Sequence, residues 1–115
     1  MITADMIYGH TDSIILCRLL DGDSYGYEIN RAIRERSHGQ FEFKEATLYT
    51  AMRRLEKDGA VCSYWGDDVA SGGGRRRYFT ITDAGRAYYA RRVREWHDLA
   101  DLMRLLLDEE QGERV

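Results

Sequence analysis

The chain has 115 residues, a hydrophobic content of 43%, a charged content of 32% and a net charge of −3. This length fits one domain with a real core, and the composition excludes a globally disordered chain. No stretch approaches the roughly 20 apolar residues of a membrane span, and the N-terminus lacks a signal-peptide pattern, so we expect a cytoplasmic protein. Neither the cysteines nor the histidines show ligand spacing; we predict reduced, packed thiols at Cys17 and Cys62, no metal and no cofactor.

The net charge does not by itself indicate a nucleic-acid partner, but the charges are unevenly placed. Basic residues gather in the middle of the chain and end in the triplet Arg75-Arg76-Arg77. Acidic residues collect between Asp98 and Glu113. A basic centre with an acidic end suits a DNA-binding face on one side of the molecule.

Two helices are predicted in the first part of the chain. The first begins at about Met6 or Thr11 and ends at Leu20, with a broad apolar face that suits a central position in a small core. Asp21-Gly22-Asp23 breaks it. Ser24 is then predicted to cap a second helix.

The second helix is expected to run from about Tyr25 to Ser37. Its predicted buried stripe consists of Tyr27 (or Tyr25), Ile29, Ala32 and Ile33. After Gly39, Phe41 and Phe43 alternate with polar residues, which indicates a short extended segment leading to the next helix.

The stretch from Lys44 to Gly59 predicts a helix with two different faces. Leu48, Met52 and Leu55 follow the spacing of a stripe that packs into a core, and Gly59 is a C-cap candidate. The other face carries hydroxyls, a phenol and guanidiniums, which suit contacts with base edges and phosphates in a DNA major groove. These candidate DNA contacts are Thr47, Tyr49, Thr50, Arg53 and Arg54. The alternative is an ordinary solvated helix face.

An antiparallel hairpin is predicted after this helix. Its strands are expected at residues 60–65 and 75–81, with a glycine-rich turn at 66–74. The triple glycine precedes a strand and lacks the Lys-Ser/Thr of a phosphate loop, so we exclude nucleotide binding. Arg75 and Arg77 should share one face of the strand, with Arg76 on the other. Such a ribbon beside a reading helix is a wing for phosphates or the minor groove; the alternative is a charge cluster that protects a strand edge.

Thr82 is predicted to cap a last helix from about Asp83 to Leu107 or beyond, ~37 Å long. Its apolar residues follow the 3-4-3-4 spacing of a coiled-coil seam, and a second stripe lies beside the first. Two adjacent stripes need a partner, most simply in a two-fold homodimer. The predicted dimer interface consists of Val93, Trp96, Leu99, Ala100, Met103, Leu106 and Leu107. A solvated end is expected at residues 108–113.

The fold class is therefore mainly α with one small hairpin, a winged helix-turn-helix with a long C-terminal helix. Residues 1–82 would form the DNA-binding part and residues 83–115 the dimerisation helix. Five segments, in order and over nearly the whole chain, resemble the PadR family of bacterial transcriptional regulators. They are Tyr25-Gly26-Tyr27-Glu28-Ile29, Ala46-Thr47-Leu48-Tyr49, Arg54-Leu55-Glu56-Lys57-Asp58-Gly59, Gly73-Gly74-Arg75-Arg76-Arg77-Tyr78 and Thr80-Ile81-Thr82-Asp83-Ala84-Gly85.

The resemblance implies a dimeric repressor that binds a palindromic promoter site in double-stranded DNA. It places Lys44 near the start of the reading helix and adds the wing as a DNA contact. The wing residues carried over by motif are Gly73, Gly74, Arg75, Arg76 and Arg77. The single C-terminal helix is similar to the short branch of the family, and parts of the chain look especially like a multidrug-binding member.

In that multidrug-binding member, a tryptophan of the C-terminal helix lines a pocket at the dimer centre, and Trp96 stands at the matching place. The resemblance thus implies a site where two indoles sandwich a planar aromatic effector. Its predicted residues are Trp96, Met6, Ser13, Val93 and Ala100. The alternative is that Trp96 only packs in the dimer core. Ala100 replaces an expected acidic residue, which puts a preference for cationic drugs in doubt, and Arg92 replaces a small one.

The leading functional prediction is a repressor that a small aromatic effector releases from DNA. A dimeric winged helix that binds another protein, and not DNA, is the alternative, supported mainly by the negative net charge. An enzyme is not expected, because no catalytic triad, carboxylate pair or metal spacing is visible.

Overall fold

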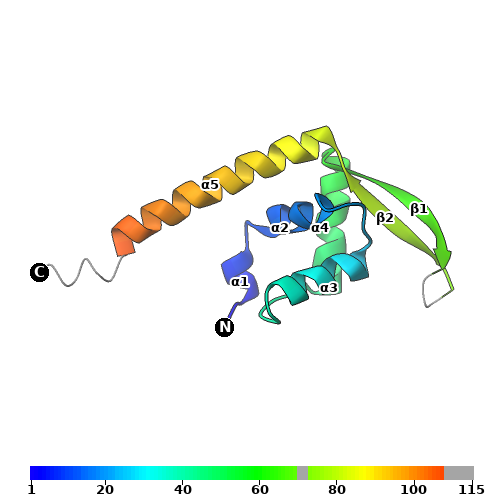
Figure 1. Ribbon diagram of the computed structural model, residues 1–115, viewed down its shortest axis with the longest axis horizontal. Helices are drawn as coiled ribbons and strands as arrows, with labels where there is room; N and C mark the ends of the chain where they lie inside the picture. The colour runs from blue at the N-terminus through cyan, green and yellow to red at the C-terminus, as the bar shows by residue number, and fades with distance from the viewer. Residues whose placement is uncertain (70–72, 108–115) are drawn as a thin grey trace, which may run out of the picture.

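The computed structural model describes residues 1–69 and 73–107. The predicted acidic end at residues 108–113 and part of the predicted turn, residues 70–72, lie outside this part of the chain. Figure 1 shows the N-terminal helices packed together, a hairpin on one side and a long last helix that starts at the hairpin and extends beyond them. The elements are α1 (Ala4–Ile7), α2 (Thr11–Leu19), α3 (Gly26–Arg36), α4 (Glu45–Lys57), β1 (Val61–Val69), β2 (Arg75–Ile81) and α5 (Asp83–Leu107). The predicted mainly helical winged helix-turn-helix is confirmed.

The core lies between α2, α3, α4 and the base of the hairpin. The stripe predicted on α4 is confirmed, because Leu48, Met52 and Leu55 are each about 1% exposed. On α3 the stripe uses Ile29 and Ile33, whereas Tyr27 is 65% exposed. Tyr25, the alternative that the sequence offered for this stripe, is half-buried, and its ring contacts that of Tyr78 in β2.

The first predicted helix is divided into α1 and α2. Gly9 has a φ of +90° between them, a left-handed conformation that glycine adopts without steric cost. Of the two predicted starting points, Met6 therefore lies in α1 and Thr11 begins α2.

Two helix ends follow their predicted caps. Gly59, with a φ of +82°, follows α4, and the amide of Ala60 donates to the carbonyl of Leu55 in the 6→1 bond of a Schellman motif. At the start of α5, the Thr82 hydroxyl accepts a hydrogen bond from the amide of Gly85 at 3.0 Å.

The predicted cap at Ser24 is wrong. The helix begins at Gly26 and its N-cap position is Tyr25. Ser24 is fully buried, its backbone pairs with Phe79 of β2, and its hydroxyl donates to Glu28 at 2.6 Å. Ser24 therefore joins α3 to the hairpin because its backbone adds a bridge to β2.

Two glycines permit close packing between elements. A Cβ on Gly26 would lie 2.6 Å from Cζ of Tyr49, so α3 and α4 approach only because this position has no side chain. A Cβ on Gly85 would overlap the Ala60 carbonyl oxygen and lie 2.9 Å from Cγ1 of Ile81. These contacts explain the glycines in two of the segments that carry the family resemblance.

The hairpin is longer than predicted. β1 continues through Gly66 to Val69, where the sequence predicted a turn, and the register shifts between Trp65 and Val69. The pairing is antiparallel, with Tyr64 opposite Tyr78 and Trp65 opposite Arg77. The strand extends beyond the predicted length because Val69 pairs with Arg75 on the far side of this irregular segment. Cys62 is exposed, so the prediction of two packed thiols holds only in part; both are free.

Candidate DNA-binding surface and adjoining cavity

The face of α4 opposite its buried stripe is exposed. Ala46, Thr50, Arg53 and Lys57 follow i, i+4, i+7, i+11 spacing and are all exposed, so they form one row, the outward stripe of α4. The stripe holds a small residue, a hydroxyl and two cations, and the Arg53 guanidinium donates to the Thr50 hydroxyl at 3.5 Å. This row can enter a groove without disturbing the core. Lys57 is an addition to the predicted contacts, marked in the sequence only by its spacing from Arg53.

Lys44 and Thr47 also lie on the surface. Lys44 occupies the N-cap position of α4 with extended backbone, and Thr47 lies on the flank beside the outward stripe. Both predicted DNA contacts are therefore accessible at the N-terminal end of α4, next to the α3–α4 connection.

Tyr49 lies on the other flank and has a structural contact. Its ring packs against Gly26 of α3, and the side chain is half-buried. Burial, with a smaller contribution from the carboxylate of Glu45, raises the pKa of Tyr49. The phenol thus stays protonated and fixes the angle between α3 and α4.

Arg54, also predicted as a DNA contact, is exposed on the surface but is held by an intramolecular ion pair. Its two terminal nitrogens donate to the carboxylate of Asp12 on α2 at 2.6 and 2.8 Å, and the Tyr88 hydroxyl of α5 donates to the same carboxylate at 2.8 Å. Burial alone would raise the pKa of Asp12, but the hydrogen bonds from Arg54 and Tyr88 outweigh it and the pKa is lowered. Asp12 therefore joins α2, α4 and α5.

The wing, defined as the hairpin β1–β2, places its arginines on two faces. Arg76 lies over the Tyr25 ring on the α3 side, 4.6 Å from the centroid. On the other face, Arg75 donates through Nε to the carbonyl of Gly66 at 2.8 Å. Arg77 contacts Glu56 of α4 and Ser63 of β1. Gly73 has a φ of +89°, and both Gly73 and Gly74 are exposed.

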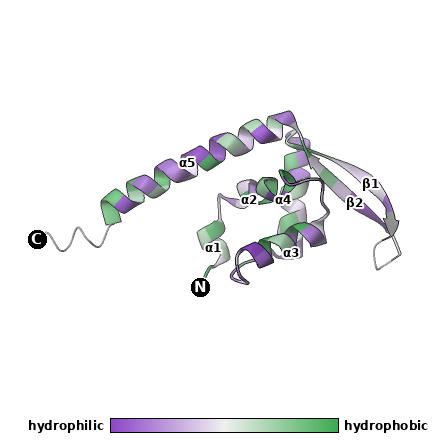
Figure 2. Ribbon diagram, in the orientation of Figure 1, coloured by the Kyte–Doolittle hydropathy of each residue, from purple (hydrophilic) through white to green (hydrophobic). Residues whose placement is uncertain are grey.

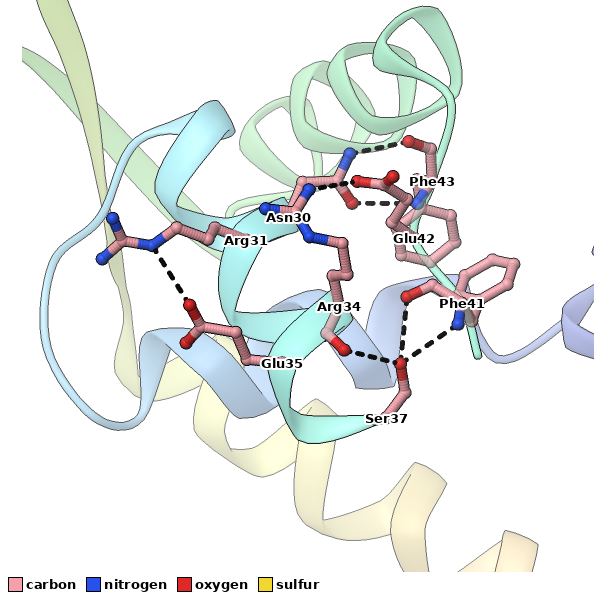
Figure 3. A network of polar contacts seen from close by, with 8 residues as sticks. All are labelled: Asn30, Arg31, Arg34, Glu35, Ser37, Phe41, Glu42 and Phe43. Atoms are coloured by element: carbon pink, nitrogen blue, oxygen red, sulfur yellow. Dashed lines mark hydrogen bonds and ion pairs between the residues drawn. The ribbon is translucent and has the colours of Figure 1, made fainter. Parts of the chain in front are cut away.

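The connection between α3 and α4 is held by side chains that sequence reasoning did not single out (Figure 3). The Asn30 amide donates to the carbonyl of Phe43 at 2.6 Å and accepts from the amide of Phe43 at 2.8 Å. The Ser37 hydroxyl accepts from the amide of Phe41, and Arg34 pairs with Glu42 at 3.0 Å. The Asn30 side chain thus pairs with both backbone groups of Phe43, as a neighbouring strand would, and fixes the backbone just before α4. An asparagine inside a helix, where its propensity is low, was the only signal.

A cavity of about 610 Å³ lies between the N-terminal segment, α2, the end of α3 and α5. It brings together four of the five predicted effector residues, Met6, Ser13, Val93 and Trp96; Ala100 does not line it. Its remaining wall is mostly apolar, with Ile14, Ile33 and Phe41, and also includes the charged side chain of Arg36. Arg92, which the sequence places near this wall, donates to the carbonyl of Gly9 at 2.6 Å and pairs with Glu95.

The second half of α5 has an exposed apolar face, and Figure 2 shows hydrophobic residues recurring to its end. Trp96 is 45% exposed and Leu106 is 66% exposed. The other large apolar side chains exposed on this half of the helix are Leu99, Leu102, Met103, Leu105 and Leu107. Val93 and Ala100 are half-buried. Every predicted interface residue is at least partly exposed in the single chain.

Comparison with known proteins identifies the family. The model of the transcriptional regulator PadR-like family matches residues 15–91. A transcriptional regulator from Clostridium thermocellum has a solved structure that is 40% identical, with a TM-score of 0.85, covering 94% of this chain and 100% of that one. A PadR family transcription regulator from Clostridium difficile R20291 is 34% identical, with a TM-score of 0.71, covering 86% and 99% respectively. A Lysinibacillus sphaericus protein, named only as uncharacterized protein X, is 44% identical over 94% of this chain and 97% of its own.

The chain belongs to the PadR-like family of transcriptional regulators. Its winged helix is that of a DNA-binding regulator, and the two solved structures are described as transcriptional regulators. Among the described residues, no helix is both long and apolar enough to span a bilayer.

Proposed function

We propose that two copies of this chain form a cytoplasmic homodimer that represses transcription by binding a palindromic site in double-stranded DNA. The main support for a dimer is the exposed apolar face on the second half of α5. Seven large apolar side chains that are each at least 43% exposed lie within residues 96–107. A contiguous apolar surface of this kind is typical of an interaction site, and a second copy supplies a self-complementary partner.

DNA contact is assigned to the outward stripe of α4, to Lys44 and Thr47, and to the wing. In a two-fold dimer the two α4 helices would enter successive major grooves about 34 Å apart. Arg53 and Lys57 would contact phosphate or guanine, and Thr50 a base edge. Arg54 has a different role here: it fixes α4 through Asp12.

The effector would bind in the cavity beside Trp96. The apolar lining and the exposed indole suit a planar aromatic molecule, and in the dimer the partner's α5 would close the open side. A bound effector would favour a dimer whose α4 helices no longer match the DNA, by at most its differential affinity for the two arrangements. Asp12 bonds both Tyr88 of α5 and Arg54 of α4. A shift of α5 would therefore be transmitted to α4 through this carboxylate.

The decisive experiment is a gel shift on the DNA upstream of the protein's own gene, repeated with a panel of aromatic compounds. We expect retarded DNA in the absence of compound and release by at least one planar member. Sedimentation in the same buffer should give a dimer. A dimer that shifts no promoter fragment and is weakly retained on heparin would instead support a protein-binding adaptor.

The cavity assignment is tested by fluorescence. Planar aromatic compounds should quench the Trp96 emission, and Trp96→Ala should abolish this quenching. Trp65 is 55% exposed on the wing and provides a background signal, so a Trp65→Phe variant is the control. No quenching across a broad panel would remove the effector site from the proposal.

A further inference from the structure

We propose that Glu56 is a positioning residue for DNA binding: with the Ser63 hydroxyl, its carboxylate holds the wing guanidinium of Arg77 against α4. The inference rests on the proposed contact between Arg77 and DNA phosphate. Glu56 comes from α4, Ser63 from β1 and Arg77 from β2. These three side chains therefore link the reading helix to both strands of the wing.

The three side chains form a closed ring of contacts. Nη2 of Arg77 lies 3.2 Å from Oε1 of Glu56, and Nε of Arg77 donates to Oγ of Ser63 at 3.0 Å. The Ser63 hydroxyl in turn donates to Oε2 of Glu56 at 2.5 Å. Each carboxylate oxygen of Glu56 thus has its own donor, and the hydroxyl both accepts and donates.

The guanidinium is also restrained from its face. Its carbon lies 5.6 Å from the centroid of the Trp65 ring, the cross-strand neighbour of Arg77, and 5.9 Å from that of Phe79. A guanidinium held by two edge contacts and an aromatic face retains few rotamers.

The ring leaves one part of Arg77 available. Its contacts use Nε and Nη2, and within residues 1–69 and 73–107 no hydrogen bond is made by Nη1. The side chain is 47% exposed, so Nη1 can reach a phosphate while the other edge remains bound. An arginine fixed in this way loses little conformational freedom when DNA binds, which is the benefit of preorganisation.

Glu56 has a second, opposing effect. Its negative charge partly neutralises Arg77 and repels a nearby phosphate. Because the two side chains are 47% and 32% exposed, solvent screens this repulsion more than it weakens the hydrogen-bonded geometry. We therefore infer that orientation outweighs repulsion, and that Glu56 increases DNA affinity although it is acidic.

The test measures binding to a fluorescently labelled duplex of mixed sequence, about two helical turns long, by anisotropy at several salt concentrations. Glu56→Ala and Arg77→Ala should each weaken binding about threefold to tenfold, and the double variant should be no weaker than Arg77→Ala alone. Glu56→Gln keeps an acceptor oxygen and should bind within about twofold of the wild type.

The matched control is Glu35→Ala, which removes the same charge from an exposed ion pair with Arg31 on α3. It should bind DNA at least as tightly as the wild type, since only general repulsion is removed. Circular dichroism at the binding temperature checks that each variant is folded, so the loss of affinity is not a loss of structure.

Unchanged or tighter binding by Glu56→Ala, with Arg77→Ala weakened, would overturn the positioning role and leave the wing as a DNA contact. Additive losses in the double variant would do the same. Unchanged affinity and salt dependence in Arg77→Ala would overturn both this inference and the proposed phosphate contact of Arg77.

Discussion

The helices α4 and α5 are both amphipathic, yet their apolar stripes have different fates. The stripe of α4 is almost completely buried by α2, α3 and the hairpin, with Met52 about 1% exposed. The stripe on the second half of α5 remains open, with Leu106 66% exposed. One chain can therefore fix the orientation of its reading helix by itself. In the proposed dimer, the spacing between the two reading helices would depend on how a second copy covers the open face of α5.

The largest expected effect comes from a substitution in the buried apolar stripe of α4. Leu48→Ala should lower the free energy of unfolding by about 2–5 kcal/mol, because it removes packed methyl groups and leaves a cavity. Urea unfolding measures the loss, which should be the same at low and high protein concentration. A loss that disappears at high concentration would mean that the α4 stripe also depends on the partner.

The matched change on the open side is Leu106→Asp. We expect dimer dissociation to become easier by roughly 2 kcal/mol or more, since a charge would enter an apolar interface, while far-ultraviolet circular dichroism of the monomer stays unchanged. Sedimentation equilibrium measures the dimer constant. An unaltered constant would show that the exposed face of α5 has another occupant.

The junction between the two helices can be weakened by Asp12→Asn. At neutral pH we expect a loss of about 1–2 kcal/mol; the Arg54 side chain is 49% exposed, so solvent recovers part of the interaction. The folded-state pKa of Asp12 is below its ordinary value of 3.8, so the carboxylate stabilises the fold above that pH. As the pH falls through the folded-state pKa, this contribution is lost.

Unfolding of the wild type and of Asp12→Asn across about pH 2–7 checks this sign, because the range spans the ordinary pKa of 3.8. The two curves should converge at the acidic end. If the difference between them is constant or grows on acidification, the Asp12 pKa is not lowered and the junction is not ionic.

The smallest effects distinguish the neighbours Arg53 and Arg54. Arg53→Ala should leave stability within about 0.5 kcal/mol and reduce the salt slope of DNA binding by about one, because an exposed cation on the outward stripe is lost. Arg54→Ala should lower stability with little change in the slope. Reversed outcomes would exchange the two roles, and Arg94→Ala, an exposed cation on α5, is the charge-matched control.

The sequence predicted the elements well where periodicity and caps act locally. The buried stripe of α4, the Schellman end at Gly59 and the threonine cap of α5 all depend on residues within a few positions of each other. The position of the hairpin was predicted correctly, but its first strand was predicted to end at residue 65 and ends at Val69. Local propensity does not show the cross-strand pairing of Val69 with Arg75.

The candidate site was less predictable because several of its side chains have distant partners. Arg53 and Arg54 are adjacent and chemically identical, but of these two it is Arg54 that pairs with Asp12, 42 positions away in the sequence. Tyr49 resembled a phosphate contact until the packing against Gly26 was visible. The roles of Asn30 and Glu56 could not be predicted, because they depend on partners from other segments. Asn30 bonds the backbone of Phe43, and Glu56 contacts Ser63 and Arg77 of the hairpin.

The sequence by itself determined the order of helices and strands, the buried face of α4, the overhanging apolar helix and the family, because all of these follow from spacing along the chain. Only the tertiary structure decided which polar residues remain available to a ligand. A side chain's hydrogen-bonding capacity is local, but its satisfaction depends on donors and acceptors that folding brings from elsewhere. That is why Arg53 faces outward, Arg54 is bound to Asp12, and Arg77 is held by Glu56.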